Sequence, residues 1–115
     1  MEYIHATSNH AFEIEEANTF FKRFLGLMGR KSLKANHGLV LDPCNSIHTY
    51  FMKFTIDVVY LDKDLKVLKV ETMEPRKIGR IVPKCKKVLE VNEGEGSFIQ
   101  VNDQFIEWRD NDEFI

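Results

Sequence analysis

The sequence predicts an α+β domain that is mainly β, a compact antiparallel barrel or sandwich of about six to eight short strands with one short helix. Three observations lead to this class. Short runs rich in β-branched and aromatic residues alternate with turn residues along the chain. Only one segment carries apolar residues at helical spacing. No strand–helix–strand pattern repeats, so a parallel α/β fold is excluded.

Length and composition indicate one domain over residues 1–115. The chain is 43% hydrophobic, which suffices for a core, and 30% charged. No apolar run approaches the ~20 residues of a membrane-spanning helix, and no basic region followed by an apolar stretch opens the chain. We therefore expect a cytoplasmic monomer without a membrane partner.

The helix is expected over residues 17–25. Asn18 and Thr19 offer side chains that cap a helix start, and Gly26 favours its end. Helical spacing predicts one apolar stripe, formed by Phe20, Phe21, Phe24, Leu25 and Met28.

Strands are predicted between clear turn signals. The opening residues 1–14 hold one or two strands. The others are expected at 38–41 before Asp42-Pro43, in a hairpin of 55–61 with 65–70, at 87–92, and in a second hairpin of 97–101 with 104–109. In the first hairpin, alternation places Ile56, Val58 and Tyr60 on one face and Asp57, Val59 and Leu61 on the other.

Charge is unevenly distributed along the chain. Residues 76–87 hold six basic residues and no acid, whereas residues 90–115 hold eight acids and one base. We expect the basic segment to face the acidic one, and the tail 110–115 to fray. The basic segment contains no aromatic residue for base stacking, and the isoelectric point is about 6.1, so nucleic acid is not an expected partner.

Three segments resemble a known family. They are the run Arg23-Phe24-Leu25-Gly26-Leu27-Met28-Gly29-Arg30, the stretch from Cys44 through His48 and Met52 to Asp62, and Val88-Leu89-Glu90-Val91 before a glycine-containing turn. Together they resemble the domain of unknown function number 192, over roughly residues 15–108. The resemblance implies a single compact domain, and it implies no activity because none is assigned to the family.

Cys44, His48 and Met52 are spaced four residues apart, and all three side chains can ligate soft metals. On a strand, the outer two would lie ~26 Å apart, and on a helix ~12 Å apart. Only a folded loop would gather them, so no metal and no cofactor is expected. Whether Cys44 and Cys85 form a disulfide stays open at this point, with two small buried residues as the simpler interpretation.

Catalysis is one interpretation of the same stretch. His48 and Asp57 are candidate acid–base groups, with Thr49 and Cys44 as further members. The alternative is structural: His48 and Thr49 hold a loop, while Asp57 pairs with Arg23 or Arg30 to fix the helix on the sheet. An enzyme would bring His48 and Asp57 into one cleft with Cys44 or Glu90.

A binding pocket is the interpretation that we favour over catalysis. Aromatic and soft side chains lie beside polar ones in a predicted loop between strands, which is the mixture that ligand pockets use. The expected function is a small binding module for an unknown small molecule or protein segment, around residues 44–57. A structural or protein-interaction domain is the further alternative, and it predicts an exposed apolar patch. The candidate ligand-binding residues are Arg23, His48, Thr49, Tyr50, Phe51, Met52 and Asp57.

Overall fold

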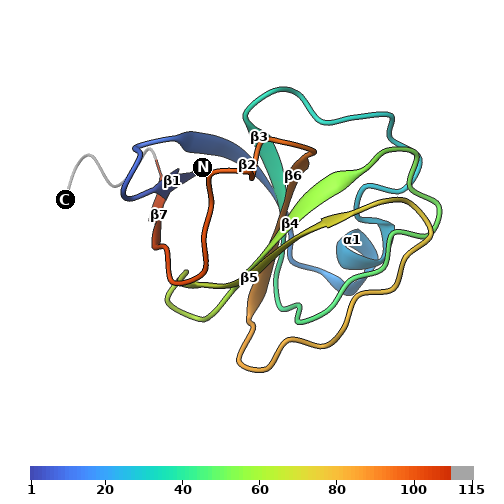
Figure 1. The fold of residues 1–115 in the computed structure, drawn as a ribbon. Coiled ribbons are helices and arrows are strands. Elements are labelled where there is room, and N and C mark those ends of the chain that lie inside the picture. The colour runs from blue at the N-terminus through green and yellow to red at the C-terminus, as the bar shows by residue number, and fades with distance from the viewer. Residues whose placement is uncertain (110–115) are drawn as a thin grey trace.

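The computed structural model describes residues 1–109. It has one helix, α1 (Phe20–Leu25), and one sheet of seven strands in the order β5-β4-β6-β3-β2-β1-β7 (Figure 1). The mainly β class predicted from the sequence is confirmed, and the predicted fraying at 110–115 lies outside the described residues. The strands are β1 (Glu2–His5), β2 (Ala11–Ala17), β3 (His37–Leu41), β4 (Ile56–Leu61), β5 (Val67–Met73), β6 (Lys87–Asn92) and β7 (Phe105–Trp108).

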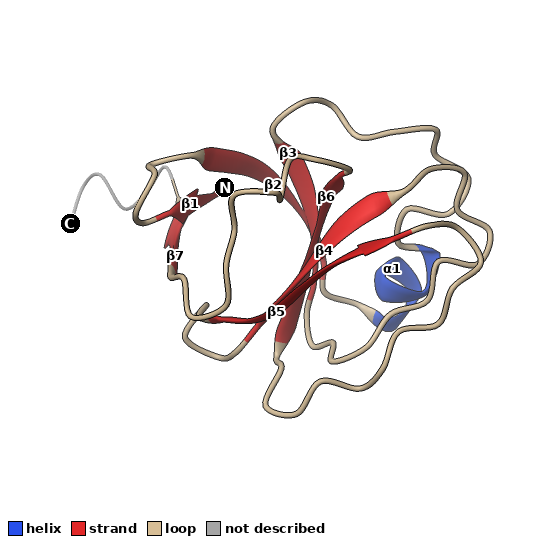
Figure 2. Ribbon diagram, viewed as in Figure 1, coloured by secondary structure: helices blue, strands red, loops and turns tan. Residues whose placement is uncertain are grey.

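The sheet curls into a half-barrel whose two edge strands, β5 and β7, approach each other at one end (Figures 1 and 2). An isolated antiparallel bridge joins Lys66 to Gln104 there. Beside it, the Val67 N–H donates to the carbonyl of Asp103, and the Asn102 N–H donates to the carbonyl of Val67, each at 2.8 Å. These bonds satisfy backbone groups that an open sheet edge would leave unpaired.

One strand pair departs from the predicted antiparallel arrangement. β2 and β3 run parallel, with Glu13 opposite His37 and Ala17 opposite Leu41. Parallel neighbours need a crossover of a dozen or more residues, and the segment between Ala17 and His37, which contains α1, supplies it. The remaining pairs in the sheet are antiparallel.

Both faces of the sheet centre are covered, so β4 is buried along its whole length. The alternation predicted for this strand is confirmed: Val59 and Leu61 belong to the core inside the half-barrel, while Val58 and Tyr60 belong to the core on its outer face. The inner core also contains Tyr3, Phe12, Val67, Leu89, Val91 and Phe105. The outer core also contains Leu27, Leu39, Leu41, Ile47, Met52, Met73 and Val88.

Long loops and α1 cover the outer face of the sheet (Figure 2). Thr49, which is completely buried, joins two of these loops. Its hydroxyl donates to the carbonyl of Glu74 at 2.5 Å and accepts from the Lys77 N–H at 2.9 Å, and its own N–H donates to the Lys77 carbonyl at 2.8 Å. Thr49 therefore holds the covering layer together.

The helix is shorter than the predicted span of 17–25, because β2 continues to Ala17. Thr19 caps it by accepting from the Lys22 N–H at 3.2 Å, as expected, and Gly26 ends it with a positive φ of 47°. The predicted apolar stripe is not buried. Phe20, Phe21 and Phe24 are 78%, 67% and 60% exposed, because α1 lies at the edge of the covering layer.

The predicted hairpin of 97–101 with 104–109 does not form. Residues 97–101 make successive turns instead, with the Ser97 N–H donating to Gly94 and the Ile99 N–H donating to Gly96. β7 pairs with β1, with Tyr3 opposite Glu107. Sequence patterns find local hairpins well, whereas this pairing joins the two ends of the described chain.

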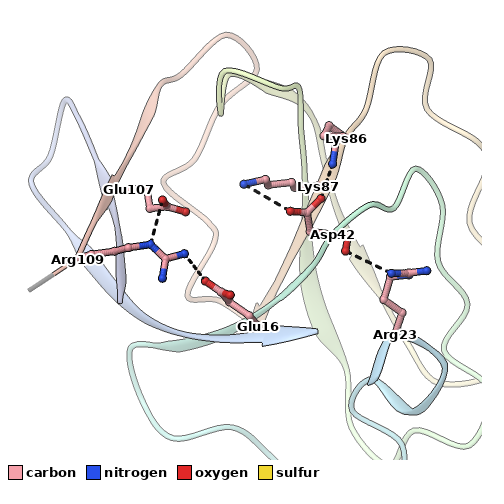
Figure 3. A network of polar contacts seen from close by, with 7 residues as sticks. All are labelled: Glu16, Arg23, Asp42, Lys86, Lys87, Glu107 and Arg109. Atoms are coloured by element: carbon pink, nitrogen blue, oxygen red, sulfur yellow. Dashed lines mark hydrogen bonds and ion pairs between the residues drawn. The ribbon is translucent and has the colours of Figure 1, made fainter. Parts of the chain in front are cut away.

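No ion pair joins the basic segment to the acidic residues of 90–109 within the described part of the chain, although Lys87 and Glu107 line one depression. Lys86 and Lys87 approach the carboxylate of Asp42, at 2.6 and 3.7 Å. Arg109 instead contacts Glu16 at 2.6 Å and Glu107 at 3.3 Å (Figure 3). Among the residues that the structure describes, the basic segment therefore pairs with Asp42 and not with the acidic residues that follow position 89.

Candidate ligand pocket

A pocket of about 280 Å³ opens between α1, the loop after it, the loop of residues 43–52 and the outer face of the sheet. Its size is near the lower end of the range for small-molecule sites. Its walls are mostly apolar, with four side chains that carry chemistry: Arg23, Cys44, His48 and Glu90. The remaining lining residues are Phe20, Phe24, Leu25, Gly26, Leu27, Met28, Leu41, Pro43, Ser46, Ile47 and Met52.

Glu90 contributes a carboxyl group from the sheet itself. It lies in the middle of β6, opposite Leu39 of β3, and is only 3% exposed. Among the described residues, no hydrogen-bond or ion-pair partner satisfies this carboxyl group. Burial raises its pKa from 4.5 to about 8. Among the described residues, the side-chain atom that is fully enclosed without a hydrogen-bond partner is His10 Nε2, so the Glu90 oxygens keep some access to the pocket. An acid that is 3% exposed and has no protein partner is still costly to fold, which makes Glu90 the most unusual group in the pocket.

Arg23 reaches the pocket from α1 and is half-buried. One of its guanidinium N–H groups donates to the backbone carbonyl of Asp42 at 3.3 Å (Figure 3). This bond connects α1 to the end of β3. Arg23 therefore stabilises the position of the helix and also lines the pocket. Its further N–H groups are oriented by the same anchor, because a guanidinium is a rigid planar fork.

His48 is exposed at the pocket, and one ring nitrogen is already occupied. The Tyr50 N–H donates to its Nδ1 at 3.2 Å. In the neutral imidazole, the proton therefore resides on Nε2, which is left as a hydrogen-bond donor.

Cys44 lines the pocket as a thiol. Its Sγ–H donates to the Ser46 carbonyl at 3.1 Å. Burial raises the thiol pKa, Glu90 raises it further, and Arg23 lowers it, so the thiol has a charged group of each sign in its surroundings. Cys85 is also free, and its Sγ–H donates to the Cys44 carbonyl at 3.4 Å. A half-buried thiol with a raised pKa is a weak nucleophile at neutral pH.

The soft side chains Cys44, His48 and Met52 do line one pocket, because their segment is a folded loop. Within residues 1–109, however, no three side chains of His, Cys, Asp and Glu gather closely enough to hold a metal ion. The His48 ring also argues against one. A metal on Nε2 would require Nδ1 to carry the proton, whereas Nδ1 accepts from a backbone N–H.

The structure brings together only part of the predicted site. Arg23, His48 and Met52 line the pocket, whereas Thr49 is buried between loops. Tyr50 and Phe51 do not line it, and they are 42% and 76% exposed. The reason is the tight fold of the loop, in which Phe51 has a positive φ of 66° and points away from the apolar interior that Met52 enters.

Asp57 is the clearest departure from the predicted site. Its carboxylate accepts from the Thr72 hydroxyl at 2.8 Å and from the N–H groups of Gly94 and Gly96, each at 2.9 Å. It therefore fixes the turn that follows β6, on the opposite face of β4 from the pocket. The expected pairing with Arg23 or Arg30 is wrong, since Arg30 binds Glu15 through two bonds of 2.8 and 2.9 Å.

Sequence reasoning missed most of the pocket walls. Glu90 was considered only as a third catalytic group, although an acid between Leu89 and Val91 in a buried strand is a signal by itself. Phe20 and Phe24 were predicted only as members of an apolar helical stripe, with no link to the pocket. No sequence pattern could show that α1 closes one side of a pocket, because that depends on where the crossover places the helix.

Fold and pocket define a class of protein: a small, curled β-sheet domain with a pocket under a short helix. The chain belongs to the family described as uncharacterized ACR, the domain of unknown function 192, whose pattern matches residues 3–105. Within residues 1–109 there is no helix long and apolar enough to cross a membrane.

Curated relatives come from archaea. The UPF0127 protein PH1112 of Pyrococcus horikoshii is 38% identical over 64% of this chain and 65% of its own length. The UPF0127 protein TK1120 of Thermococcus kodakarensis is 34% identical over 72% of this chain, which spans 62% of that protein. The UPF0127 protein PF1050 of Pyrococcus furiosus is 32% identical over 84% of this chain and 86% of that protein.

Solved structures share the fold. A protein of unknown function from Novosphingobium aromaticivorans has a TM-score of 0.76 at 20% identity and covers 94% of this chain and 93% of its own. A candidate transcription regulator from Sinorhizobium meliloti has a TM-score of 0.80 at 21% identity and covers 91% and 89%. At these identities the likeness concerns the fold alone.

The three segments that carry the family resemblance converge on the pocket. The run 23–30 contributes Arg23 and Phe24, the stretch 44–62 contributes Cys44 and His48, and the strand 88–91 contributes Glu90. They are separated by long stretches of chain, and the fold places them around one cavity.

Proposed function

We propose that this protein is a small binding module that takes its ligand in the pocket between α1 and the sheet. The observation that supports this most is the carboxyl group of Glu90, which is buried at the pocket and has no partner among the described residues. Buried polar groups in folded proteins are nearly always hydrogen-bonded. A ligand that bonds to Glu90 would remove this cost, and the apolar walls would bury the rest of it.

The alternative of an enzyme that uses His48 with Asp57 has less support. Asp57 lines a separate depression with Thr72, Gly94 and Gly96, and its oxygens are engaged in holding a turn. General acid–base catalysis needs both groups within reach of one substrate. The Cys44 thiol has a raised pKa, which does not favour nucleophilic attack.

The experiment is thermal unfolding of the protein against a panel of metabolites, repeated with His48→Ala and with His37→Ala as a matched control. His37 lies in β3 and does not line the pocket. A ligand at 100 times its Kd stabilises the fold by about 2.7 kcal/mol. We expect a hit that shifts the midpoint of the wild type and of His37→Ala by several degrees and shifts His48→Ala less.

The cysteines report on where a hit binds. Cys44 lines the pocket and Cys85 does not, although both are half-buried. A ligand in the pocket should slow the reaction of Cys44 with a small thiol reagent, measured by mass spectrometry, and leave the rate at Cys85 unchanged. Hits that protect neither thiol, or an absence of hits across the panel, would contradict the proposed function.

A further inference from the structure

We infer that the ligand of this pocket presents a primary ammonium group on an apolar body, with the ammonium bound by Glu90. The inference rests on the proposed function and names the chemical class of its ligand. It begins from the placement of Glu90, which is the one carboxyl group among the lining residues and is 97% shielded from solvent, at 3% exposure.

Complementarity to this carboxyl group favours a cation. Away from bulk water, two opposite charges attract about four times more strongly than they do in water. An ammonium group supplies three N–H donors, so it provides both the missing hydrogen bond and the counter-charge. A hydroxyl group would supply one donor and no charge, and a carboxylate would repel the ionised acid.

The walls of the pocket fit the same class. Phe20 and Phe24 line the pocket from α1, with ring centroids 6.5 Å apart and nearly parallel planes. They are 78% and 60% exposed, so they add apolar surface for the part of the ligand that stays near solvent. The aliphatic lining from Leu27, Leu41 and Met52 would bury the rest of the apolar body.

Arg23 and His48 do not reverse this preference. Burial is the one cause of the raised pKa of Glu90, so Arg23 is not close enough to pair with its carboxyl group. Arg23 is half-buried and His48 is exposed, so water screens the charge of Arg23 more than that of Glu90. Both side chains could donate to an acceptor elsewhere on the ligand. The carboxyl group of Glu90 therefore determines which charge is favoured on the ligand group that enters the pocket.

Binding of an ammonium group is expected to release a proton from Glu90. Burial raises the pKa of Glu90 to about 8, so below pH 8 the carboxyl group is protonated and must release its proton when an ammonium group binds. The association constant should therefore rise about tenfold for each pH unit between pH 5 and pH 8 and then level off. A neutral ligand that accepts a bond from the protonated acid would show the opposite trend.

The test is isothermal titration of the whole protein at about pH 8.5, above the pKa of Glu90. Three compounds that share one apolar body are compared: phenethylamine, 2-phenylethanol and 3-phenylpropionate. Glu90→Gln keeps the shape and removes the charge, and Glu74→Gln alters an exposed loop carboxylate as the matched control. We expect phenethylamine to bind the wild type and Glu74→Gln at least tenfold more tightly than it binds Glu90→Gln. In the wild type, the alcohol and the acid should bind at least tenfold more weakly than the amine.

The ammonium group can belong to a free amine or to a lysine side chain of a protein segment. Nα-acetyl-lysine methylamide, titrated in parallel, distinguishes the two sources: tighter binding than phenethylamine indicates a protein segment, and weaker binding indicates a free amine. Both results support a ligand that presents a primary ammonium group.

Three outcomes would overturn the inference. They are equal or tighter binding of the alcohol or the acid, undiminished binding of the amine to Glu90→Gln, and no binding of any amine. Whether the pocket binds any ligand is tested separately from the class of that ligand. If the alcohol or acid protects Cys44 but not Cys85 from the thiol reagent, the pocket binds ligands of another class and the proposed function stands.

Discussion

Replacing Glu90 by glutamine should stabilise the protein, and more so as the pH rises. The carboxyl group is buried without a partner among the described residues, and burial raises its pKa from 4.5 to about 8. Between these two values the folded state binds one proton that the unfolded state releases. The stability that depends on the protonated Glu90 carboxyl group is therefore fully present below pH 4.5 and is lost as the pH rises through 8. Glutamine has no proton to exchange in this range.

The magnitude follows from the same shift. Each pH unit between the two pKa values changes the free energy of unfolding by about 1.4 kcal/mol. At pH 7, which is 2.5 units above the ordinary value of 4.5, the wild type should have lost about 3 kcal/mol relative to its stability at pH 4.5. This is a large share of the 5–15 kcal/mol that is typical for a folded domain.

The assay is urea unfolding at pH 5, 6, 7 and 8, followed by the fluorescence of Trp108, the single tryptophan. The difference in unfolding free energy between Glu90→Gln and the wild type isolates this one group, because the other titrating groups are common to both proteins. We expect the difference to grow by about 1.4 kcal/mol per pH unit from pH 5 and to flatten as the pH approaches 8.

Glu74→Gln is the matched control, since it makes the same chemical change at an exposed position. Its pH dependence should run parallel to that of the wild type. A difference for Glu90→Gln that stays constant from pH 5 to pH 8 would refute the reasoning, because it would mean that the carboxyl group is solvated or paired in the folded protein.

Three further predictions concern the architecture, each measured by urea unfolding at pH 7. Asp57→Ala should destabilise by about 4 kcal/mol, because two N–H groups and a hydroxyl lose a charged acceptor; a loss below 1 kcal/mol would mean that the turn holds without it. Gly38→Ala should cost about 1–3 kcal/mol, since a Cβ there would lie 2.7 Å from Leu89 Cδ1 and 3.2 Å from the Glu90 carbonyl; an unchanged midpoint would contradict this contact. Phe21→Ser should change stability by less than about 0.5 kcal/mol, because Phe21 is 67% exposed; a large loss would show that the ring packs in solution.

Residue types alone predicted only part of the pocket. The sequence indicated the right loop and the right kind of side chains, and His48, Met52 and Arg23 do line the pocket. It also suggested neighbours of His48 that point elsewhere. In a tight loop, consecutive residues face different directions, and Phe51 takes a left-handed backbone conformation that no local pattern announced.

Local patterns were sufficient wherever the interaction that decides the structure is local. The alternation along β4, the extent of β6 and the Thr19 cap of α1 depend on neighbouring residues, and the structure confirms all three. The family resemblance likewise follows from short runs of residues, and the match over residues 3–105 confirms it.

Only the tertiary structure decided the remaining features, because they join parts of the chain that lie far apart. The parallel pairing of β2 with β3 and the pairing of β1 with β7 depend on how the crossover and the curl of the sheet place each strand. The same curl gives the two acids in neighbouring strands opposite environments. Asp57 accepts from two N–H groups of a turn and from the Thr72 hydroxyl, while Glu90 has no partner at the pocket among residues 1–109. From the amino-acid sequence alone both are carboxyl groups between apolar neighbours, and the arrangement of the sheet and its covering loops determines which is structural and which is available to a ligand.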